Sequence, residues 1–305
     1  MEFRTLTEGL EFPEGPVVVP DGSIVLVEIA AGALTRVASN GTKHVIARPG
    51  GGPNGAAIGP DGNCYVVNNG GFSWHRENGR IRPMMQAADY SGGRVERVDL
   101  QTGAVDVLYR ACGDVPLKGP NDIVFDTEGG FYFTDLGKVR ARDMDRGAVY
   151  YAKADGSSIT EVAYPMVTPN GIGLSPDGTT LYVAETEAAR LWAFPIEAPG
   201  VVRKEPWPSP HGGKLIAGMG GYQRFDSLAV QADGRICVAT LINGGITVIS
   251  PDGRHIEHHP MPDPMTTNIC FGGPDLKTAY ITLSWTGRLV AVEWPSAGLR
   301  LNHQA

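Results

Sequence analysis

Six stretches of the chain share one pattern of apolar and polar positions. In each, a polar residue precedes a short apolar run, a tight turn and a second run rich in β-branched and aromatic residues, as at 63–67 and 180–184. The last residue of the turn follows the polar residue by eight positions in all six stretches. This pattern predicts pairs of β-strands joined by reverse turns. The six polar residues, called the anchors below, are Glu14, Asn54, Asn121, Asn170, Asp226 and Asn268.

The turn triplets and their spacing predict the architecture. Pro-Asp-Gly occurs at 20–22, 60–62 and 176–178, and it reverses a chain because Pro presets φ, Asp bonds its own backbone and Gly accepts a positive φ. Successive anchors are 40 to 67 residues apart, a range that includes the repeat length of four-stranded propeller blades. Such a sheet cannot bury both faces alone, so the repeats must pack around an axis. We therefore expect an all-β fold, a six-bladed β-propeller that forms one domain over residues 1–305.

The same topology predicts where the surplus length lies. Residues 3–7 should add the outer strand of the last blade and close the ring, which covers an edge. If each first strand runs away from its anchor, the second strand returns, so the insertions at 70–93, 136–147 and 199–224 share the anchored face. Long loops on one face of a scaffold commonly carry function. The first insertion, rich in aromatic residues, is either a lid over the channel or an ordinary packed loop.

Charge and composition narrow the classes of partner. The net charge of −7 gives no basic patch for nucleic acid or an anionic membrane, and it tolerates cations. No apolar stretch approaches a membrane span, and the first residues lack a signal pattern, so a cytoplasmic protein is expected, as a monomer or a small homo-oligomer. The four cysteines form no C-x-x-C motif, and we expect them to be reduced and structural.

The anchors offer oxygen atoms to a common channel. One Glu, one Asp and four Asn suit Ca²⁺, Mg²⁺ or Mn²⁺, which prefer hard oxygen ligands. Asn and Asp also cap loops that enter strands, and that simpler interpretation applies to any single anchor. For the whole ring the metal is favoured, because the carboxylates of Glu14 and Asp226 would otherwise face each other unpaired. No G-x-S-x-G motif or glycine-rich phosphate loop occurs, which argues against α/β-hydrolases and nucleotide-binding folds.

Four motifs at the anchors resemble a known family. Phe-Pro-Glu-Gly-Pro at 12–16, Gly-Pro-Asn-Asp at 119–122, Thr-Pro-Asn-Gly-Ile at 168–172 and Thr-Asn-Ile-Cys-Phe-Gly-Gly at 267–273 are similar to the senescence-marker-protein/gluconolactonase family. That family includes luciferin-regenerating enzymes and is structurally similar to diisopropylfluorophosphatase and the paraoxonases. The resemblance runs from the first anchor to about residue 294.

The resemblance implies a lactonase with one divalent metal ion in the channel. Glu14, Asn170 and Asp226 would bind the ion, with Asn121 as a fourth or water-mediated ligand. Ca²⁺ is the expected ion, while Zn²⁺, Mg²⁺, Mn²⁺ or Fe²⁺ could replace it. The ion would polarise the carbonyl of a small lactone, and Asp226 would act as base or nucleophile.

Substrate contacts are expected from residues around the ion. Asn54, Asn121 and Asn268 are assigned to the substrate or to supporting contacts. Asp135, which ends a second strand, is either a ligand of substrate hydroxyls or a strand-end carboxylate satisfied by the protein. Lys138 and the arginines of the same insertions could attract an anionic substrate, although solvated surface charge is the simpler interpretation.

Two departures and two rival functions stay open. Sugar-lactonase relatives often carry Arg where this chain has Gly119, and Ser227 follows an anchor where Gly is usual, which weakens the case for gluconolactone. The rivals are a phosphotriesterase-like hydrolase on the same metal and a non-catalytic calcium- or ligand-binding propeller. A strictosidine-synthase type of propeller, which needs no metal, fits the Glu14–Asp226 pair poorly.

Overall fold

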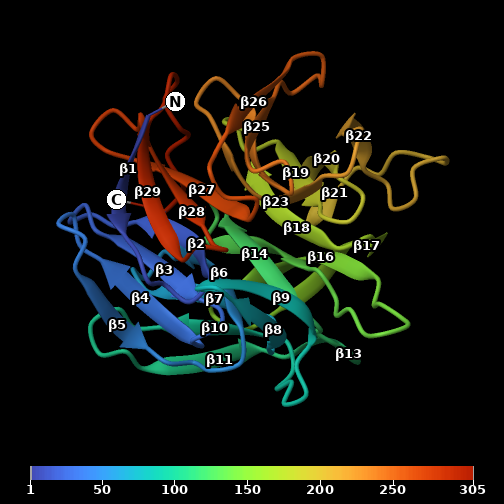
Figure 1. Ribbon diagram of the computed structural model, residues 1–305. Coiled ribbons are helices and arrows are strands. Elements are labelled where there is room, and N and C mark those ends of the chain that lie inside the picture. Colours follow the sequence, from blue (N-terminus) through green and yellow to red (C-terminus); the bar gives the residue numbers. More distant parts are fainter. Residues whose placement is uncertain (1, 305) are drawn as a thin grey trace.

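Six antiparallel sheets surround a central channel in the computed structural model, which describes residues 2–304 (Figure 1). Blade 1 consists of β2 (Pro13–Val18), β3 (Ile24–Glu28), β4 (Ala33–Val37) and β5 (Lys43–Ala47). Blade 2 consists of β6 (Pro53–Ile58), β7 (Cys64–Asn68), β10 (Arg94–Val98) and β11 (Val105–Tyr109). Blade 3 consists of β14 (Pro120–Phe125), β15 (Gly130–Asp135), β16 (Gly147–Lys153) and β17 (Ile159–Met166).

The second half of the ring continues the same order. Blade 4 consists of β18 (Pro169–Leu174), β19 (Thr180–Glu185), β20 (Arg190–Ala198), β21 (Val201–Val202) and β22 (Lys214–Gly218). Blade 5 consists of β23 (Arg224–Val230), β24 (Ile236–Leu241), β25 (Gly245–Ile249) and β26 (Ile256–Pro260). Blade 6 consists of β27 (Thr266–Gly272), β28 (Thr278–Leu283), β29 (Arg288–Glu293) and β1 (Phe3–Thr7). The all-β, six-bladed propeller predicted from the sequence is confirmed.

Blade 6 closes the ring with both ends of the chain. The N-terminal strand β1 pairs antiparallel with β29, with Phe3 opposite Val292, and Figure 1 shows the blue strand beside the red one. The outer strand of the last blade therefore comes from the first residues, as the sequence predicts. This pairing joins two segments almost 300 residues apart and leaves β1 as a short outer edge.

The six turns adopt the predicted conformation. The last residue of each triplet has a positive φ, between 57° at Leu276 and 88° at Gly234. Five of these residues are glycines, which enter this region without steric cost. Leu276 does so without that freedom, and its N–H donates to the carbonyl of Gly273. The sixth turn therefore has the conformation of the other five without a glycine, because it keeps its backbone hydrogen bond.

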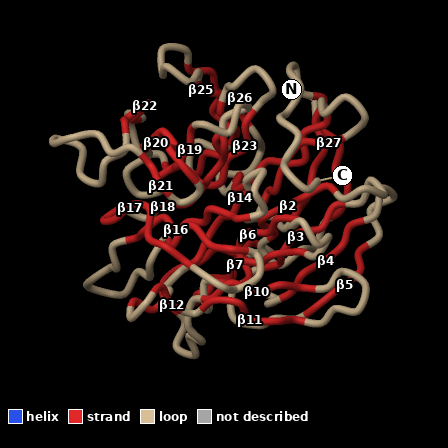
Figure 2. The backbone as a smooth tube through the Cα atoms, turned by 180° about the vertical axis from the view of Figure 1, so that it is seen from behind, coloured by secondary structure: helices blue, strands red, loops and turns tan. Residues whose placement is uncertain are grey.

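Strands and loops alone build the described residues, as the tube of Figure 2 shows. No helix long and apolar enough to cross a membrane is found within residues 2–304. Additional short strands lie in the insertions: β8 (Phe72–Glu77) and β9 (Arg80–Gln86) form a hairpin, and β12 (Ala111–Cys112) pairs with β13 (Val115–Pro116). The four cysteines are free, and Cys64, Cys237 and Cys270 are buried, as expected from the sequence.

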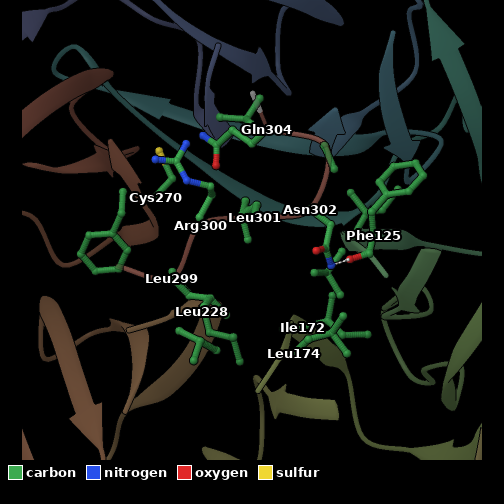
Figure 3. A pocket seen from close by; sticks show the side chains of 18 of the residues that line it. Phe125, Ile172, Leu174, Leu228, Cys270, Leu299, Arg300, Leu301, Asn302 and Gln304 are labelled. Carbon is green, nitrogen blue, oxygen red and sulfur yellow. Dashed lines mark hydrogen bonds between the residues drawn. The ribbon is translucent and has the colours of Figure 1, made fainter. Parts of the chain in front are cut away.

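The end of the chain closes the turn face of the channel, which the sequence did not predict. Leu299 N–H donates to Val230 of blade 5, the Asn302 amide to the Phe125 carbonyl of blade 3, and the Gln304 amide to the Val18 carbonyl of blade 1. Between this segment and the inner strands lies a cavity of about 260 Å³, whose lining includes Ile172, Leu174 and Leu228 (Figure 3).

Aromatic rings fill the space between blades 2 and 3. Phe131 is fully buried, and its ring centroid lies 5.7 Å from that of Tyr65, 5.2 Å from that of Phe125 and 6.0 Å from that of Phe133. Because Tyr65 belongs to the neighbouring blade, this cluster joins two sheets that share no backbone hydrogen bonds. Apolar packing of this kind holds the blades at their spacing.

Truncation of the central ring of this cluster should destabilise the protein strongly. Phe131→Ala is expected to lower the free energy of unfolding by about 3–5 kcal/mol, since it leaves a cavity in close-packed surroundings. Phe3→Ala, at an edge position that is 38% exposed, serves as the control and should cost about 0.5 kcal/mol or less. Urea denaturation checks both variants, and equal losses would contradict a stabilising role of the interblade cluster.

Candidate metal centre

The six anchors lie at the beginnings of the six innermost strands. Each is the second or third residue of its strand, from β2, β6, β14, β18, β23 and β27 in turn, and all are buried. Each of these strands contacts the next around the ring, and β27 contacts β2. The predicted ring of oxygen-bearing side chains is therefore brought together at one height of the channel.

A β-bulge lies at every anchor. In all six blades the pairing of the first strand with the second shifts register at the anchor or within two residues of it, as between Glu14 and Val17 and between Pro169 and Ile172. A bulge bends its strand and redirects a side chain, and bulges are common next to active sites. The repeated shift explains how successive inner strands can all turn one polar side chain toward the axis.

Glycines after three anchors permit the inner strands to approach closely. A Cβ atom added to Gly55 would lie 2.6 Å from the carbonyl oxygen of Asn121, and one added to Gly171 would lie 2.6 Å from that of Asp226. At Gly15, where φ is also positive at 51°, it would lie 2.7 Å from the backbone nitrogen of Ala56. These positions require glycine, because any side chain would push neighbouring blades apart.

Hydrogen bonds pair anchors across blade boundaries. The Asn268 amide of blade 6 donates to Glu14 Oε2 of blade 1 over 2.8 Å, and the Asn170 amide of blade 4 donates to Asp226 Oδ1 of blade 5 over 2.6 Å. The Asn54 amide donates to the backbone carbonyl of Asn121 over 3.0 Å. Each carboxylate is thus oriented by an amide from an adjacent inner strand.

A third carboxyl group, Asp122, joins the two that the sequence identified. It is 7% exposed, and its Oδ1 accepts the N–H of Ile123. Asp122 ends the Gly-Pro-Asn-Asp motif at 119–122, but no role was predicted for it. The signal was its position directly after an anchor, where Gly15, Gly55 and Gly171 stand in other blades.

The pKa of each of the three carboxyls is raised. Burial is the largest cause, and it raises the pKa of Glu14 and that of Asp122 to about 7. Burial and then the negative charge of Glu14 hold the pKa of Asp226 well above its usual range, although the Asn170 amide opposes the shift. Such clustered, desolvated acids are typical of functional sites.

The residues present fit a hard divalent cation. Asn121 Oδ1 is buried and has no hydrogen-bond partner, so it is free to bind an ion. Residues 2–304 contain no group of three His, Cys, Asp or Glu side chains arranged to hold a metal. The candidate set therefore mixes the carboxylates of Glu14 and Asp226 with the amides of Asn121 and Asn170, a donor chemistry that Ca²⁺ accepts.

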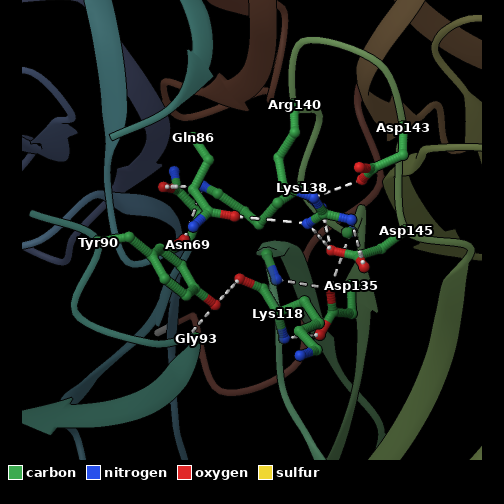
Figure 4. A network of polar contacts seen from close by, with 12 residues as sticks. Asn69, Gln86, Tyr90, Gly93, Lys118, Asp135, Lys138, Arg140, Asp143 and Asp145 are labelled. Carbon is green, nitrogen blue, oxygen red and sulfur yellow. Dashed lines mark hydrogen bonds and ion pairs between the residues drawn. The ribbon is translucent and has the colours of Figure 1, made fainter. Parts of the chain in front are cut away.

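Asp135 lies at the strand end that the sequence indicated, but the protein satisfies its carboxylate. Its oxygens accept the N–H groups of Lys118, Gly119 and Gly137 over 2.6–2.9 Å (Figure 4). These bonds favour the structural alternative over a contact with substrate hydroxyls. Asn268 is similarly committed, because its amide donates to Glu14 and its Oδ1 accepts the N–H of Ile269.

The β8–β9 hairpin extends from blade 2 across the anchored face. Ile81 N–H donates to the Trp285 carbonyl of blade 6, and Gln86 N–H donates to Val139 in the 136–147 insertion of blade 3. Toward blade 1, the Trp74 ring packs on Phe12 with centroids 5.2 Å apart. The hairpin therefore contacts three other blades, and these contacts agree with both interpretations from the sequence, a lid and a packed loop.

Comparison with known proteins agrees with this geometry. Residues 12–284 match the model of the SMP-30/gluconolactonase/LRE-like region. The chain belongs to this family. The match includes all six anchors and ends shortly after the second strand of blade 6.

Curated relatives and solved structures are similar over different shares of the chain. Lactonase drp35 of Staphylococcus haemolyticus is 30% identical over 84% of this chain and 71% of its own length. For lactonase drp35 of Staphylococcus saprophyticus the identity is 33%, but the match spans 54% of this chain and 46% of the relative. Two structures share the fold at a TM-score of 0.75: a calcium-binding protein, regucalcin, from Agrobacterium tumefaciens (22% identity, 98% of each chain) and a gluconolactonase from Xanthomonas campestris (21% identity, 96% of this chain and 89% of that one).

The raised pKa of Glu14 predicts a pH-dependent stability for the metal-free protein. A carboxyl with a folded pKa of about 7 and an ordinary value of 4.5 costs nothing below pH 4.5 and destabilises the fold increasingly as the pH rises to about 7. Glu14→Gln removes this cost. Relative to the wild type, its free energy of unfolding should therefore increase across that window.

Urea denaturation of chelator-treated protein at several pH values measures this difference. The exposed Glu128→Gln is the control, and its difference from the wild type should stay constant with pH. A constant difference for Glu14→Gln as well would contradict the raised pKa.

Proposed function

We propose that this protein is a divalent-metal-dependent lactonase, which opens a cyclic ester to a hydroxy acid. The observation that carries the proposal is the buried donor ring, in which the unpartnered Asn121 Oδ1 accompanies two carboxylates without a counter-ion. Membership of the family and the lactonase names of its relatives support the same reaction.

Four anchors would hold the ion: Glu14, Asn121, Asn170 and Asp226. When bound, a divalent cation supplies Lewis-acid polarisation of the lactone carbonyl and compensates the negative charge that develops on its oxygen. Ca²⁺ best matches carboxylate and amide oxygens, and Zn²⁺, Mg²⁺, Mn²⁺ or Fe²⁺ are the alternatives to test. The calcium-binding description of the regucalcin structure supports the first choice.

Asp226 is the group proposed to move the proton. Burial and its carboxyl neighbours raise its affinity for a proton, so as a carboxylate it can take one from water while the water oxygen bonds to the carbonyl carbon. The ring C–O bond then breaks, and the same proton passes to the leaving alkoxide, which becomes the hydroxyl of the product. Asn170 holds Oδ1 of Asp226 in place. In the alternative mechanism, the Asp226 carboxylate attacks the carbonyl carbon directly.

Asn54, Asn121 and Asn268 are proposed to contact the substrate or to orient the groups that contact it. The Asn54 oxygen accepts from the Asn69 amide, and one of the two Asn54 amide hydrogens is used by the Asn121 carbonyl. The second amide hydrogen is left for the substrate. The hairpin places Phe72 and Trp74 on the anchored face, and Gly119 offers no side chain to a polyol. Both features favour a lactone with an apolar or aromatic substituent over a sugar lactone.

Turnover of a lactone panel tests the proposal. Proton release from sugar, aliphatic and aromatic lactones is measured with metal-stripped protein and after addition of each of the five ions. The wild type should hydrolyse at least one lactone only with metal, and Asp226→Asn should lower kcat by about 10²–10⁴-fold, the usual contribution of general base catalysis.

The control variant is Asp177→Asn, which removes an exposed carboxylate of a turn triplet and should leave kcat unchanged. Metal binding without any turnover would contradict the lactonase and favour a binding protein. Turnover of phosphotriesters alone would favour the phosphotriesterase-like hydrolase.

A further inference from the structure

Lys138 is buried inside the protein although its residue type favours the surface. It lies in the 136–147 insertion and is 1% exposed, so the interpretation of this charge as solvated is wrong. Its ammonium donates to the backbone carbonyls of Asn69 and Gly71, both over 2.9 Å, and to Asn69 Oδ1 over 3.2 Å (Figure 4). The ring of Phe72 lies 4.0 Å from Nζ. A buried lysine is costly, and these contacts compensate the cost.

The contacts of Lys138 continue into the donor ring. The Asn69 amide donates to Asn54 Oδ1 over 3.1 Å, and the Asn54 amide donates to the Asn121 carbonyl over 3.0 Å. All four residues are at most 5% exposed. A continuous series of hydrogen bonds therefore connects a lysine of the blade 3 insertion, through blade 2, to the backbone of a candidate metal ligand.

The ammonium group fixes the direction of every bond in this series. Burial lowers the pKa of Lys138 to about 7. In its ammonium form the group can only donate, so the Asn69 atom that faces it must be the oxygen, and the Asn69 NH₂ must face Asn54. Asn54 then presents its oxygen to Asn69 and its NH₂ to the carbonyl of Asn121, which can only accept. The N–H of Gly71 supports the same orientation by donating to Asn69 Oδ1. A donor therefore faces an acceptor in every bond of the series, from the Lys138 ammonium to the Asn121 carbonyl.

The surrounding loop holds Lys138 in place. Its N–H donates to Asp145 Oδ2 and its carbonyl accepts the N–H of Asp145. Two hydrogen bonds between Arg140 and Asp145 brace that carboxylate. The nearest carboxylates therefore bind backbone and guanidinium groups, and the three acceptors of the ammonium are uncharged.

We propose that Lys138 is a positioning residue of the metal centre, which acts through Asn69 and Asn54 to hold the Asn121 ligand. This inference rests on the proposed function. Without the ammonium, Asn69 loses its charged donor, and only the N–H of Gly71 and the carbonyl of Asn121 hold the Asn69–Asn54 pair in its orientation. The Asn121 backbone can then shift and take its unpartnered Oδ1 out of place. Supporting groups of this kind usually contribute about 10–100-fold to metal affinity or activity.

A double-mutant cycle tests the connection. Lys138→Met, Asn54→Ala and the double variant are titrated with Ca²⁺ by calorimetry, and kcat and KM are measured on the best lactone of the panel. Each single variant should lower Ca²⁺ affinity or kcat by about 10–100-fold, and the double variant should lose no more than the worse single one, because both break one series.

The matched control combines Lys138→Met with Thr186→Val. Thr186 accepts a hydrogen bond from Asn170 on the other side of the ring, outside the series, so these two losses should multiply. If the losses of Lys138→Met and Asn54→Ala multiplied in the double variant, the proposal would be overturned. Wild-type Ca²⁺ affinity and kcat in Lys138→Met would overturn it as well.

Asn69→Asp separates positioning from folding, should Lys138→Met prove unstable. The carboxylate keeps an acceptor for Lys138 but removes the donor to Asn54, so stability in urea should be kept while Ca²⁺ affinity or kcat falls about 10–100-fold. A stable variant with wild-type affinity and kcat would overturn the inference alone. A wild type that neither binds Ca²⁺ nor hydrolyses any lactone would overturn the proposed function together with it.

Discussion

Close approach of the six innermost strands is the constraint on which the site depends. At Gly15, Gly55 and Gly171 an inner strand lies against the next backbone so tightly that a Cβ atom would come within 2.7 Å of it. The bulge at each anchor turns one side chain toward the axis at this narrow level. Six polar groups thereby share a small volume that large side chains could not create, and the outer strands and interblade aromatic rings keep that spacing.

Carboxyl groups held this closely, without bulk water, cannot all be ionised unless a cation accompanies them. Burial raises the pKa of Glu14 and Asp122 to about 7 and holds that of Asp226 well above its usual range. The site is thus unstable in the charged state when empty and suited to a divalent ion. The same low-dielectric surroundings strengthen the hydrogen bonds of Asn170 and Asn268, which orient the carboxylates.

The repeat could be predicted from the sequence because each blade depends on local rules. An anchor, a turn eight residues later and alternating apolar positions specify β2–β3 as well as β27–β28, and even Leu276 keeps the turn. Asp122, Lys138 and the closing segment after Leu299 were missed for a different reason. Their burial results from contacts between distant segments, such as Lys138 with Gly71, 67 residues apart, and Asn302 with Phe125, 177 residues apart, and no periodicity records these. A charged residue in a loop looks solvated until the partner loop is known.

Under the proposed function, the arrangement of the two ends of the channel makes the hairpin the candidate for substrate selection. The final residues cross the turn face and are bonded to blades 1, 3 and 5, so under the proposed function a lactone reaches the anchors from the opposite face. The β8–β9 hairpin, which carries Phe72 and Trp74, extends across that face. Propellers of one fold differ in chemistry, and the geometry of the six anchors does not by itself distinguish one cyclic ester from another. Under the proposed function, we therefore expect selection among cyclic esters from the hairpin insertion rather than from the donor ring.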